Sequence, residues 1–180
     1  YTKNLFGTTR IKDCDAQIYP KNKNLCLIAS QKKYAQGHKI RHAIADTIGN
    51  RYEIDLYGRK YKEFPEGGKV DFLKDYRFEI TLENSKLVNY FTEKIIDAFR
   101  VGTVPIYWGC PNISDFFNPD GIIAFNSGKE LKNILNDLSL EEYNCRMPAI
   151  RENFELAKKW RIRDDILCDD IIEAIEKNEK

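Results

Sequence analysis

Residues 78–99 read FEITLENSKLVNYFTEKIIDAF, and this stretch decides the fold. Its first five residues alternate large apolar side chains with polar or small ones, which is typical of a β-strand. A polar loop follows, and apolar side chains then recur on one face of a helix. Thr92 is a suitable N-cap for that helix, so Glu93 and Lys94 are expected in its first turn.

A strand, a polar loop and a helix N-terminus together form a natural anion site, because unpaired N–H groups point out of the helix end. Glu93 offers an acceptor for sugar hydroxyls, and Lys94 beside it offers a cation for phosphate. This combination fits a nucleotide-sugar pocket. A plainer interpretation is equally open, since a first-turn Glu complements the helix dipole and Glu-Lys pairs are common on solvated helices.

Two segments of the chain carry a resemblance to a known family. The run ENSxxxxYxTEKIIDA at 83–98, followed by VPIYWGCP at 104–111, resembles the donor-binding signature of the α-1,3/1,4-fucosyltransferases, glycosyltransferase family ten. The resemblance implies transfer of fucose from GDP-fucose to a glycan hydroxyl, with inversion and without a metal. It also implies that the donor is bound by five residues: Arg41, Asn84, Tyr90, Glu93 and Lys94.

In this resemblance Asn84 and Tyr90 help to hold the donor, and Glu93 accepts hydrogen bonds from the ribose hydroxyls. Arg41 and Lys94, with the helix N-terminus, neutralise the departing diphosphate. Arg41 is assigned because the context Ile40-Arg41-x-Ala43 matches, the alternative being an ordinary surface arginine. The resemblance places the general base on an N-terminal acceptor domain, so no catalytic residue is assigned in this chain.

The pattern of the whole chain predicts alternating strands and helices. Strands are expected at 25–30, 52–58, 76–82, 104–108 and 121–125. Helices are expected at 38–49, 70–75, 93–99, 129–138, 140–159 and 161–176. This order indicates an α/β fold with a Rossmann-like, doubly wound parallel sheet, which the resemblance identifies as the C-terminal half of a GT-B glycosyltransferase. Such sheets bind ligands at the carboxyl ends of their strands, where Arg41, residues 84–94 and Gly109 fall.

The predicted domain division separates residues 1–24 from residues 25–180. The first part is polar and irregular, as expected of a linker or of the tail of an N-terminal domain, and the second is the donor-binding domain with its C-terminal helices. The chain begins with Tyr1 rather than Met, as expected of a fragment or a processed chain. An N-terminal acceptor domain or a partner chain is then needed to supply the general base.

The composition of the chain argues against several other classes of protein. The 29 Lys and Arg residues nearly balance the 28 Asp and Glu residues, so no global field favours nucleic acid. The five cysteines form no C-x-x-C pair, which favours a reducing compartment over a disulfide framework or a zinc cluster. No run approaches the roughly 20 apolar residues of a membrane span. The expected location is cytoplasmic or membrane-associated for a bacterial or viral protein, and the Golgi lumen for a fragment of a eukaryotic enzyme.

Weaker signals point elsewhere. Asp13-Cys14-Asp15 has the D-x-D form of metal-dependent glycosyltransferases, but two aspartates in a polar segment are usually only solvated. His38 and His42 have helical spacing without a third ligand. Arg59 or Tyr61 is a further candidate for lining the donor site.

Three other functions remain open. One is a module that binds a GDP-sugar without turnover, and another is a transferase for a different nucleotide-activated hexose. Nucleic-acid binding through the basic clusters at 21–39 and 158–163 is the weakest, because acidic residues balance them elsewhere.

Overall fold

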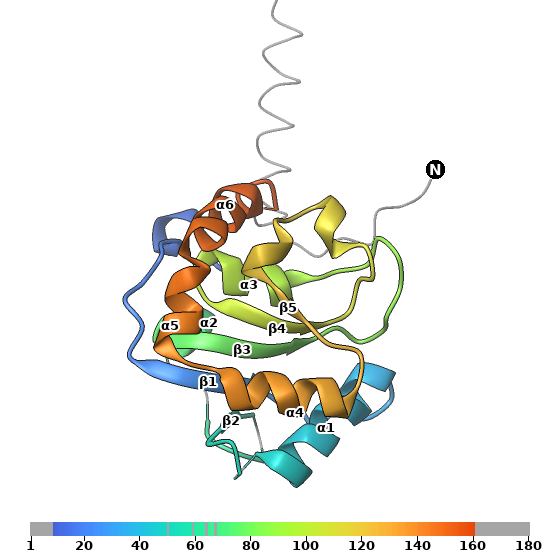
Figure 1. The fold of residues 1–180 in the computed structure, drawn as a ribbon. Coiled ribbons are helices and arrows are strands. Elements are labelled where there is room, and N and C mark those ends of the chain that lie inside the picture. Colours follow the sequence, from blue (N-terminus) through green and yellow to red (C-terminus); the bar gives the residue numbers. More distant parts are fainter. Residues whose placement is uncertain (1–8, 50, 59, 64, 67, 161–180) are drawn as a thin grey trace, which may run out of the picture.

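The sheet of this chain is fully parallel. In the computed structural model, which describes residues 9–49, 51–58, 60–63, 65–66 and 68–160, five strands pair in the order β2-β1-β3-β4-β5 (Figure 1). The strands are β1 (Lys23–Ile28), β2 (Asp55–Tyr57), β3 (Tyr76–Leu82), β4 (Val104–Trp108) and β5 (Ile123–Ala124). The predicted parallel α/β sheet is therefore confirmed, and β3 and β4 have the predicted bounds.

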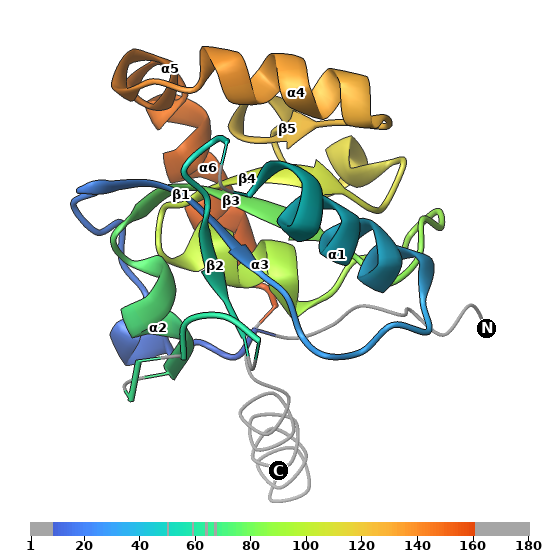
Figure 2. The same cartoon turned by 90° about the horizontal axis from the view of Figure 1, so that it is seen from below.

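Helices cover both faces of the sheet. They are α1 (Gln36–Ile48), α2 (Gly68–Leu73), α3 (Glu93–Arg100), α4 (Gly128–Asp137), α5 (Leu140–Cys145) and α6 (Met147–Ala157), with short 3-10 turns at η1 (Asp13–Asp15), η2 (Ile113–Asp115) and η3 (Pro119–Gly121). Apolar residues of α1, α4 and α5 share one core cluster with one face of the sheet. Those of α2 and α3 form clusters on the opposite face (Figure 2). The sheet is doubly wound, as predicted.

The two faces of β3 differ in chemistry. Phe78, Ile80 and Leu82 are buried in the cluster that α1 covers. Alternation along a strand sends the intervening side chains to the other face. On that face Glu79 and Thr81 are buried too. A buried polar row of this kind needs partners. The Thr81 hydroxyl donates to Glu79 Oε2 at 3.1 Å, and Lys69 of α2 supplies a positive charge that acts on Glu79.

Two predicted strands are shorter than expected. The expected strand 52–58 is reduced to β2 because the chain turns after α1 through residues 51–53, with Glu53 at a φ of +50°. The expected strand 121–125 is reduced to the two residues of β5, since η3 occupies its beginning. Both are edge strands of the sheet, which are specified less strongly than central ones.

The predicted helix 140–159 is wrong as one element. It divides at Arg146 into α5 and α6, with Pro148 in the first turn of α6. Proline has no N–H and clashes with the preceding turn, so it begins a helix more readily than it continues one. The expected helix 161–176 lies outside the described residues.

The N-terminal segment packs closely against the sheet domain. Ile11 is 1% exposed and belongs to a core cluster with Phe72 and Val101. Lys21 Nζ donates to the carbonyl oxygens of Lys74 and Val101 at 2.9 and 2.7 Å. β1 begins at residue 23, so the predicted boundary at residue 24 falls inside a strand. The domain division itself stays a prediction.

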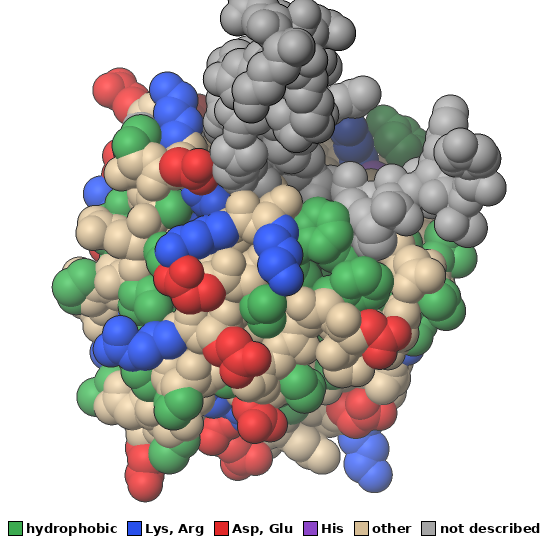
Figure 3. Space-filling view, turned by 90° about the horizontal axis from the view of Figure 1, so that it is seen from above, with side chains coloured by type: hydrophobic (Ala, Val, Ile, Leu, Met, Phe, Trp, Pro, Cys, Tyr) green, Lys and Arg blue, Asp and Glu red, His purple; other side chains and the backbone are tan. Residues whose placement is uncertain are grey.

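The surface of the domain carries both signs of charge. Figure 3 shows Lys and Arg side chains mixed with Asp and Glu on the face seen from above. Within the described ranges, no helix is both long and apolar enough to cross a membrane.

The glycine at position 37 should be essential for placing α1. A Cβ on Gly37 would lie 1.7 Å from the main-chain oxygen of Glu83, and the Gly37 N–H donates to the oxygen of Asn84 at 3.0 Å. We expect Gly37→Ala to lower the unfolding free energy by about 1–3 kcal/mol through overpacking. Gly128→Ala is the matched control, because no atom lies within 4 Å of its Cβ. Equal stability of the two variants in urea denaturation would contradict this account.

Lys21 should make stability depend on pH. Burial lowers its pKa to about 7. Between about pH 7 and pH 10 the unfolded chain therefore holds a proton on this amine that the folded chain lacks, so the unfolding free energy rises with pH. We expect this rise to be smaller in Lys21→Met and intact in the exposed control Lys129→Met. Denaturation curves at three pH values test it, and parallel pH profiles for wild type and Lys21→Met would rule it out.

Candidate functional site

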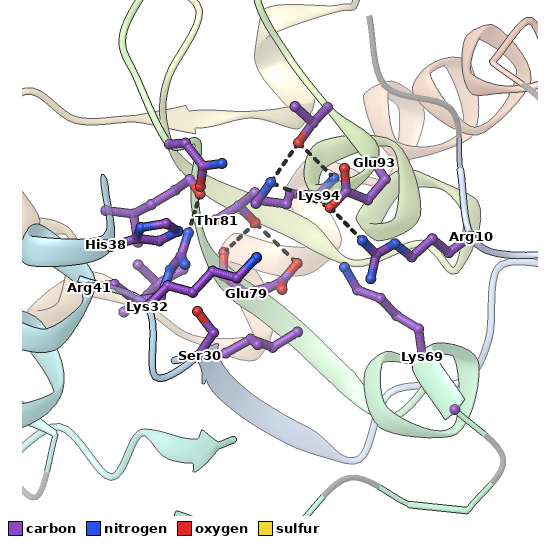
Figure 4. A pocket seen from close by; sticks show the side chains of 16 residues that line it. Arg10, Ser30, Lys32, His38, Arg41, Lys69, Glu79, Thr81, Glu93 and Lys94 are labelled. Carbon is purple, nitrogen blue, oxygen red and sulfur yellow. Dashed lines mark hydrogen bonds and ion pairs between the residues drawn. The ribbon is translucent and has the colours of Figure 1, made fainter. Parts of the chain in front are cut away.

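A cavity of about 640 Å³ opens at the carboxyl ends of β1 and β3. The first residues of α1, α2 and α3 surround it (Figure 4). The strand order changes direction between β1 and β3, and ligands of doubly wound sheets bind at such a point. Four of the five predicted donor residues line this cavity, namely Arg41, Asn84, Glu93 and Lys94.

The N-terminus of α3 is held in place by a buried carboxylate. Glu83, fully buried just after β3, accepts hydrogen bonds from the N–H of Thr92 at 2.9 Å and from its hydroxyl at 2.6 Å. Thr92 is the N-cap, as predicted, and accepts from the N–H of Lys94. Lys94 Nζ donates to the Thr92 hydroxyl at 2.8 Å. The spacing between Glu83 and Thr92 in the signature thus fixes where α3 begins and where Lys94 lies.

Glu93 is surrounded by cations. Its Oε1 lies 3.4 Å from Lys94 Nζ and 3.4 Å from the guanidinium of Arg10. Burial opposes ionisation of Glu93, but the charges of Lys94 and Arg10 outweigh it and lower its pKa. Glu93 is therefore an ionised acceptor at neutral pH, which is the state that hydrogen bonding to sugar hydroxyls requires.

Arg41 is not a surface arginine. It is 6% exposed, and its guanidinium donates to the carbonyl oxygen of Leu82 at 2.5 Å. This bond fixes the side chain at the carboxyl end of β3 while further N–H donors remain for a ligand. The alternative of an exposed side chain, left open by the sequence, is wrong because α1 places Arg41 against the sheet edge.

The two remaining predicted residues, Asn84 and Tyr90, differ in their position relative to the cavity. The amide oxygen of Asn84 is buried and has no hydrogen-bond partner in the described part of the chain, so it is available to a ligand donor. Tyr90 is not among the residues that line the cavity, although burial and the charges of Glu83 and Glu93 raise its pKa. Its role in donor binding stays a prediction.

Four charged residues of the cavity were missed from the sequence: Arg10, Lys32, Lys69 and Glu79. Asp97 on α3 brings two of them together. Fully buried, it accepts from the N–H of Arg10 at 2.8 Å and lies 3.2 Å from Lys69 Nζ. The available signal was the spacing of Glu93 and Asp97, which are four residues apart and share a helix face.

Of the weaker sequence candidates in the described part of the chain, Asp13 and Tyr61 lie outside the cavity lining and His38 lies in it. Asp13 in η1 pairs with Arg100 instead, and Tyr61 is absent from the cavity lining. His38 does line the cavity, with its Nδ1 accepting from the N–H of Ala35 at 3.3 Å. Arg59 lies outside the described residues. In the described ranges no three His, Cys, Asp or Glu side chains gather in a way that could hold a metal ion.

Gly109 serves packing rather than ligand approach. A Cβ there would lie 2.4 Å from the Tyr107 hydroxyl and 2.6 Å from Glu83 Cγ. Position 109 must therefore lack a side chain so that the buried Glu83 can be accommodated.

Replacing Glu83 should disturb the site without removing a ligand contact. Glu83→Gln leaves one acceptor for the two donors of Thr92, so we expect a loss of about 1–3 kcal/mol in unfolding free energy. The exposed Glu141→Gln is the control, with little expected change. Thermal and urea unfolding measure the effect. If Glu83→Gln were as stable as the control, the buried carboxylate would not be fixing α3.

Comparison with known proteins gives a consistent assignment. The family model described as glycosyltransferase family 10 (fucosyltransferase), C-terminal part, matches residues 18–178. Over 92 residues the chain is 38% identical to the alpha-(1,3)-fucosyltransferase of Helicobacter pylori, an alignment that covers 50% of this chain and 19% of that protein. It is 35% identical over 92 residues to 4-galactosyl-N-acetylglucosaminide 3-alpha-L-fucosyltransferase of Homo sapiens, covering 48% of this chain and 26% of the relative.

Solved structures agree in fold. A crystal structure of an alpha1,3-fucosyltransferase with GDP-fucose superposes with a TM-score of 0.58 and 28% identity, covering 74% of this chain and 39% of that one. A second structure, with GDP, gives the same values. The chain thus spans about a fifth to a quarter of the curated relatives it matches. With the signature, the doubly wound fold and the match over residues 18–178, this chain belongs to glycosyltransferase family 10, the fucosyltransferases.

Proposed function

We propose that this chain is the donor-binding domain of a fucosyltransferase that transfers fucose from GDP-fucose to a glycan hydroxyl with inversion. Membership of family 10 supports the reaction class, and the similar crystal structures with GDP-fucose and GDP support the donor. The observation that carries the proposal is the convergence of Arg41 from α1 and of Glu93 and Lys94 from α3 on one cavity.

Each residue has a role that its chemistry suits. Glu93 accepts hydrogen bonds from the ribose hydroxyls, and Arg41 and Lys94 bind the diphosphate. The dipole of α3 adds positive potential beside Lys94 at its N-terminus. Asn84 offers its unpaired amide oxygen to a donor of the ligand, and Tyr90 helps to hold the donor. Two cations and a helix end supply the charge that a metal would otherwise supply, so the proposed transferase is metal-independent.

Charge develops on the diphosphate as the bond between the sugar and the phosphate breaks. Groups already fixed in position stabilise that charge without having to reorganise, and this is commonly the largest contribution to catalysis. Arg41 is fixed by Leu82 and Lys94 by Thr92. The other requirement of an inverting reaction is a base that deprotonates the acceptor hydroxyl. In our proposal an N-terminal acceptor domain or a partner chain supplies it.

A second candidate is a module that binds a GDP-sugar without turnover. The cavity and the family match support donor binding and assign no general base among the described residues. Fucose release from GDP-fucose in the presence of a glycan acceptor distinguishes the two. A transferase for another hexose would show the same cavity and a different donor preference.

Binding of the donor tests the proposal directly. We expect the full chain to bind GDP-fucose in a calorimetric titration with EDTA present, and to bind GDP-mannose and UDP-galactose more weakly. Lys94→Ala removes a charged contact to the diphosphate and should weaken GDP-fucose binding about 10- to 100-fold. The control is Lys132→Ala, which changes an exposed residue of α4.

Unchanged affinity in a folded Lys94→Ala protein would remove the central assignment. Wild-type protein that binds none of the three nucleotide sugars would overturn the proposal for this chain.

A further inference from the structure

Among the charged side chains of the cavity that have no part in the proposed function are Glu79 on β3 and Lys69 on α2. Glu79 is 3% exposed, and the Thr81 hydroxyl donates to its Oε2 at 3.1 Å. Thr81 is the one hydrogen-bond donor that reaches this carboxylate from the described part of the chain. A carboxylate has room for about four hydrogen bonds. Glu79 therefore keeps free acceptor capacity on the wall of a cavity, which indicates a ligand.

Lys69 lies next to this carboxylate. Burial raises the pKa of the Glu79 carboxyl, and the charge of Lys69 is the largest effect that opposes this rise and favours the ionised form. Figure 4 shows the two charged ends directed to the same part of the cavity. Lys69 is also held by Asp97, with 3.2 Å between Nζ and Oδ2. The cavity wall thus presents a fixed acceptor beside a fixed donor.

The position of Glu79 and Lys69 relative to the predicted donor-binding residues indicates which part of the donor they contact. Arg41 is bonded at Leu82, three residues beyond Glu79 along β3, which corresponds to about 10 Å. Lys69 lies at the other end of the cavity wall. There Asp97 bonds both to Lys69 and to the main-chain N–H of Arg10. The guanidinium of Arg10 in turn contacts Glu93. A nucleotide carries its base and its 5′-phosphates on opposite sides of the ribose. With the ribose at Glu93 and the phosphates toward Arg41, the base points toward Glu79 and Lys69.

We propose, resting on the function proposed above, that Glu79 and Lys69 recognise the guanine base of the donor. The carboxylate of Glu79 accepts hydrogen bonds from guanine N1–H and from the 2-amino group, and the ammonium of Lys69 donates to O6. Guanine alone among the common bases presents an acceptor followed by two donors along this edge. Adenine would place its amino group against Lys69, and uracil would place a carbonyl oxygen against Glu79, leaving buried charges unpaired.

Titration with four nucleoside diphosphates tests the base preference in the wild-type chain. Inosine diphosphate is the decisive probe, because it differs from GDP only in lacking the 2-amino group. We expect GDP to bind about 10- to 100-fold more tightly than inosine diphosphate, as for loss of one hydrogen bond to a charged group. ADP and UDP should bind more weakly still. Equal binding of GDP and inosine diphosphate would overturn the proposal.

Variants assign the preference to its residues. Glu79→Gln presents an amide N–H₂ to the guanine donors, so the ratio of GDP to inosine diphosphate affinity should fall to near one. Lys69→Met should weaken both nucleotides by the same factor, because both carry O6, and should leave the ratio unchanged. The control is Glu155→Gln, an exposed residue of α6, with wild-type behaviour expected. Circular dichroism verifies that each variant is folded.

The outcomes separate this inference from the function on which it rests. If wild-type protein does not bind GDP, the proposed function fails. If it binds GDP and a folded Glu79→Gln protein keeps the wild-type ratio, the donor site stands and the assignment to Glu79 is overturned.

Discussion

The rest of the structure depends on the contact between the buried carboxylate of Glu83 and the N-cap Thr92. An ionised carboxylate without partners would be costly inside a protein. Here it accepts both donors of Thr92, and Lys94 lies 3.5 Å from it. The pairing closes the loop between β3 and α3 and sets the first residue of the helix. It also explains why position 109 is a glycine, since a Cβ there would meet the Glu83 side chain.

A second buried carboxylate, Asp97, ties the N-terminal segment to the same helix. Thr9 Oγ1 donates to it at 2.6 Å, and the N–H of Arg10 donates at 2.8 Å. Residues 9–11 of the N-terminal segment bring Arg10 to the cavity beside Glu93. α3 thus forms one wall of the cavity, and its two carboxylates, Glu93 and Asp97, engage the charges of Arg10 and Lys69 from distant segments. In our proposal, the donor binds at Glu93 beside this contact with Arg10.

The sequence predicted the bounds of two central strands correctly, β3 and β4, whose apolar patterning is strongly selected by packing. The third central strand, β1, begins and ends two residues before the expected range 25–30. The edge strands β2 and β5 proved shorter, since turns at Glu53 and in η3 occupy part of their expected length. The apolar pattern predicts one helix over 140–159, but Pro148 starts α6 instead of continuing α5.

The sequence by itself determined the parallel α/β fold, the start of α3 and the presence of Arg41, Glu93 and Lys94 on one rim. It could do so because the carboxyl ends of parallel strands meet at one edge, so residues that follow successive strands converge. Only the tertiary structure decided that Arg10, Lys69 and Glu79 belong to the same cavity. Arg10 and Asp97 are 87 residues apart, and local periodicity carries no information about such a pairing. These residues meet because carboxylates on β3 and α3 are buried, and Lys69 of α2 and Arg10 of the N-terminal segment provide the compensating charges.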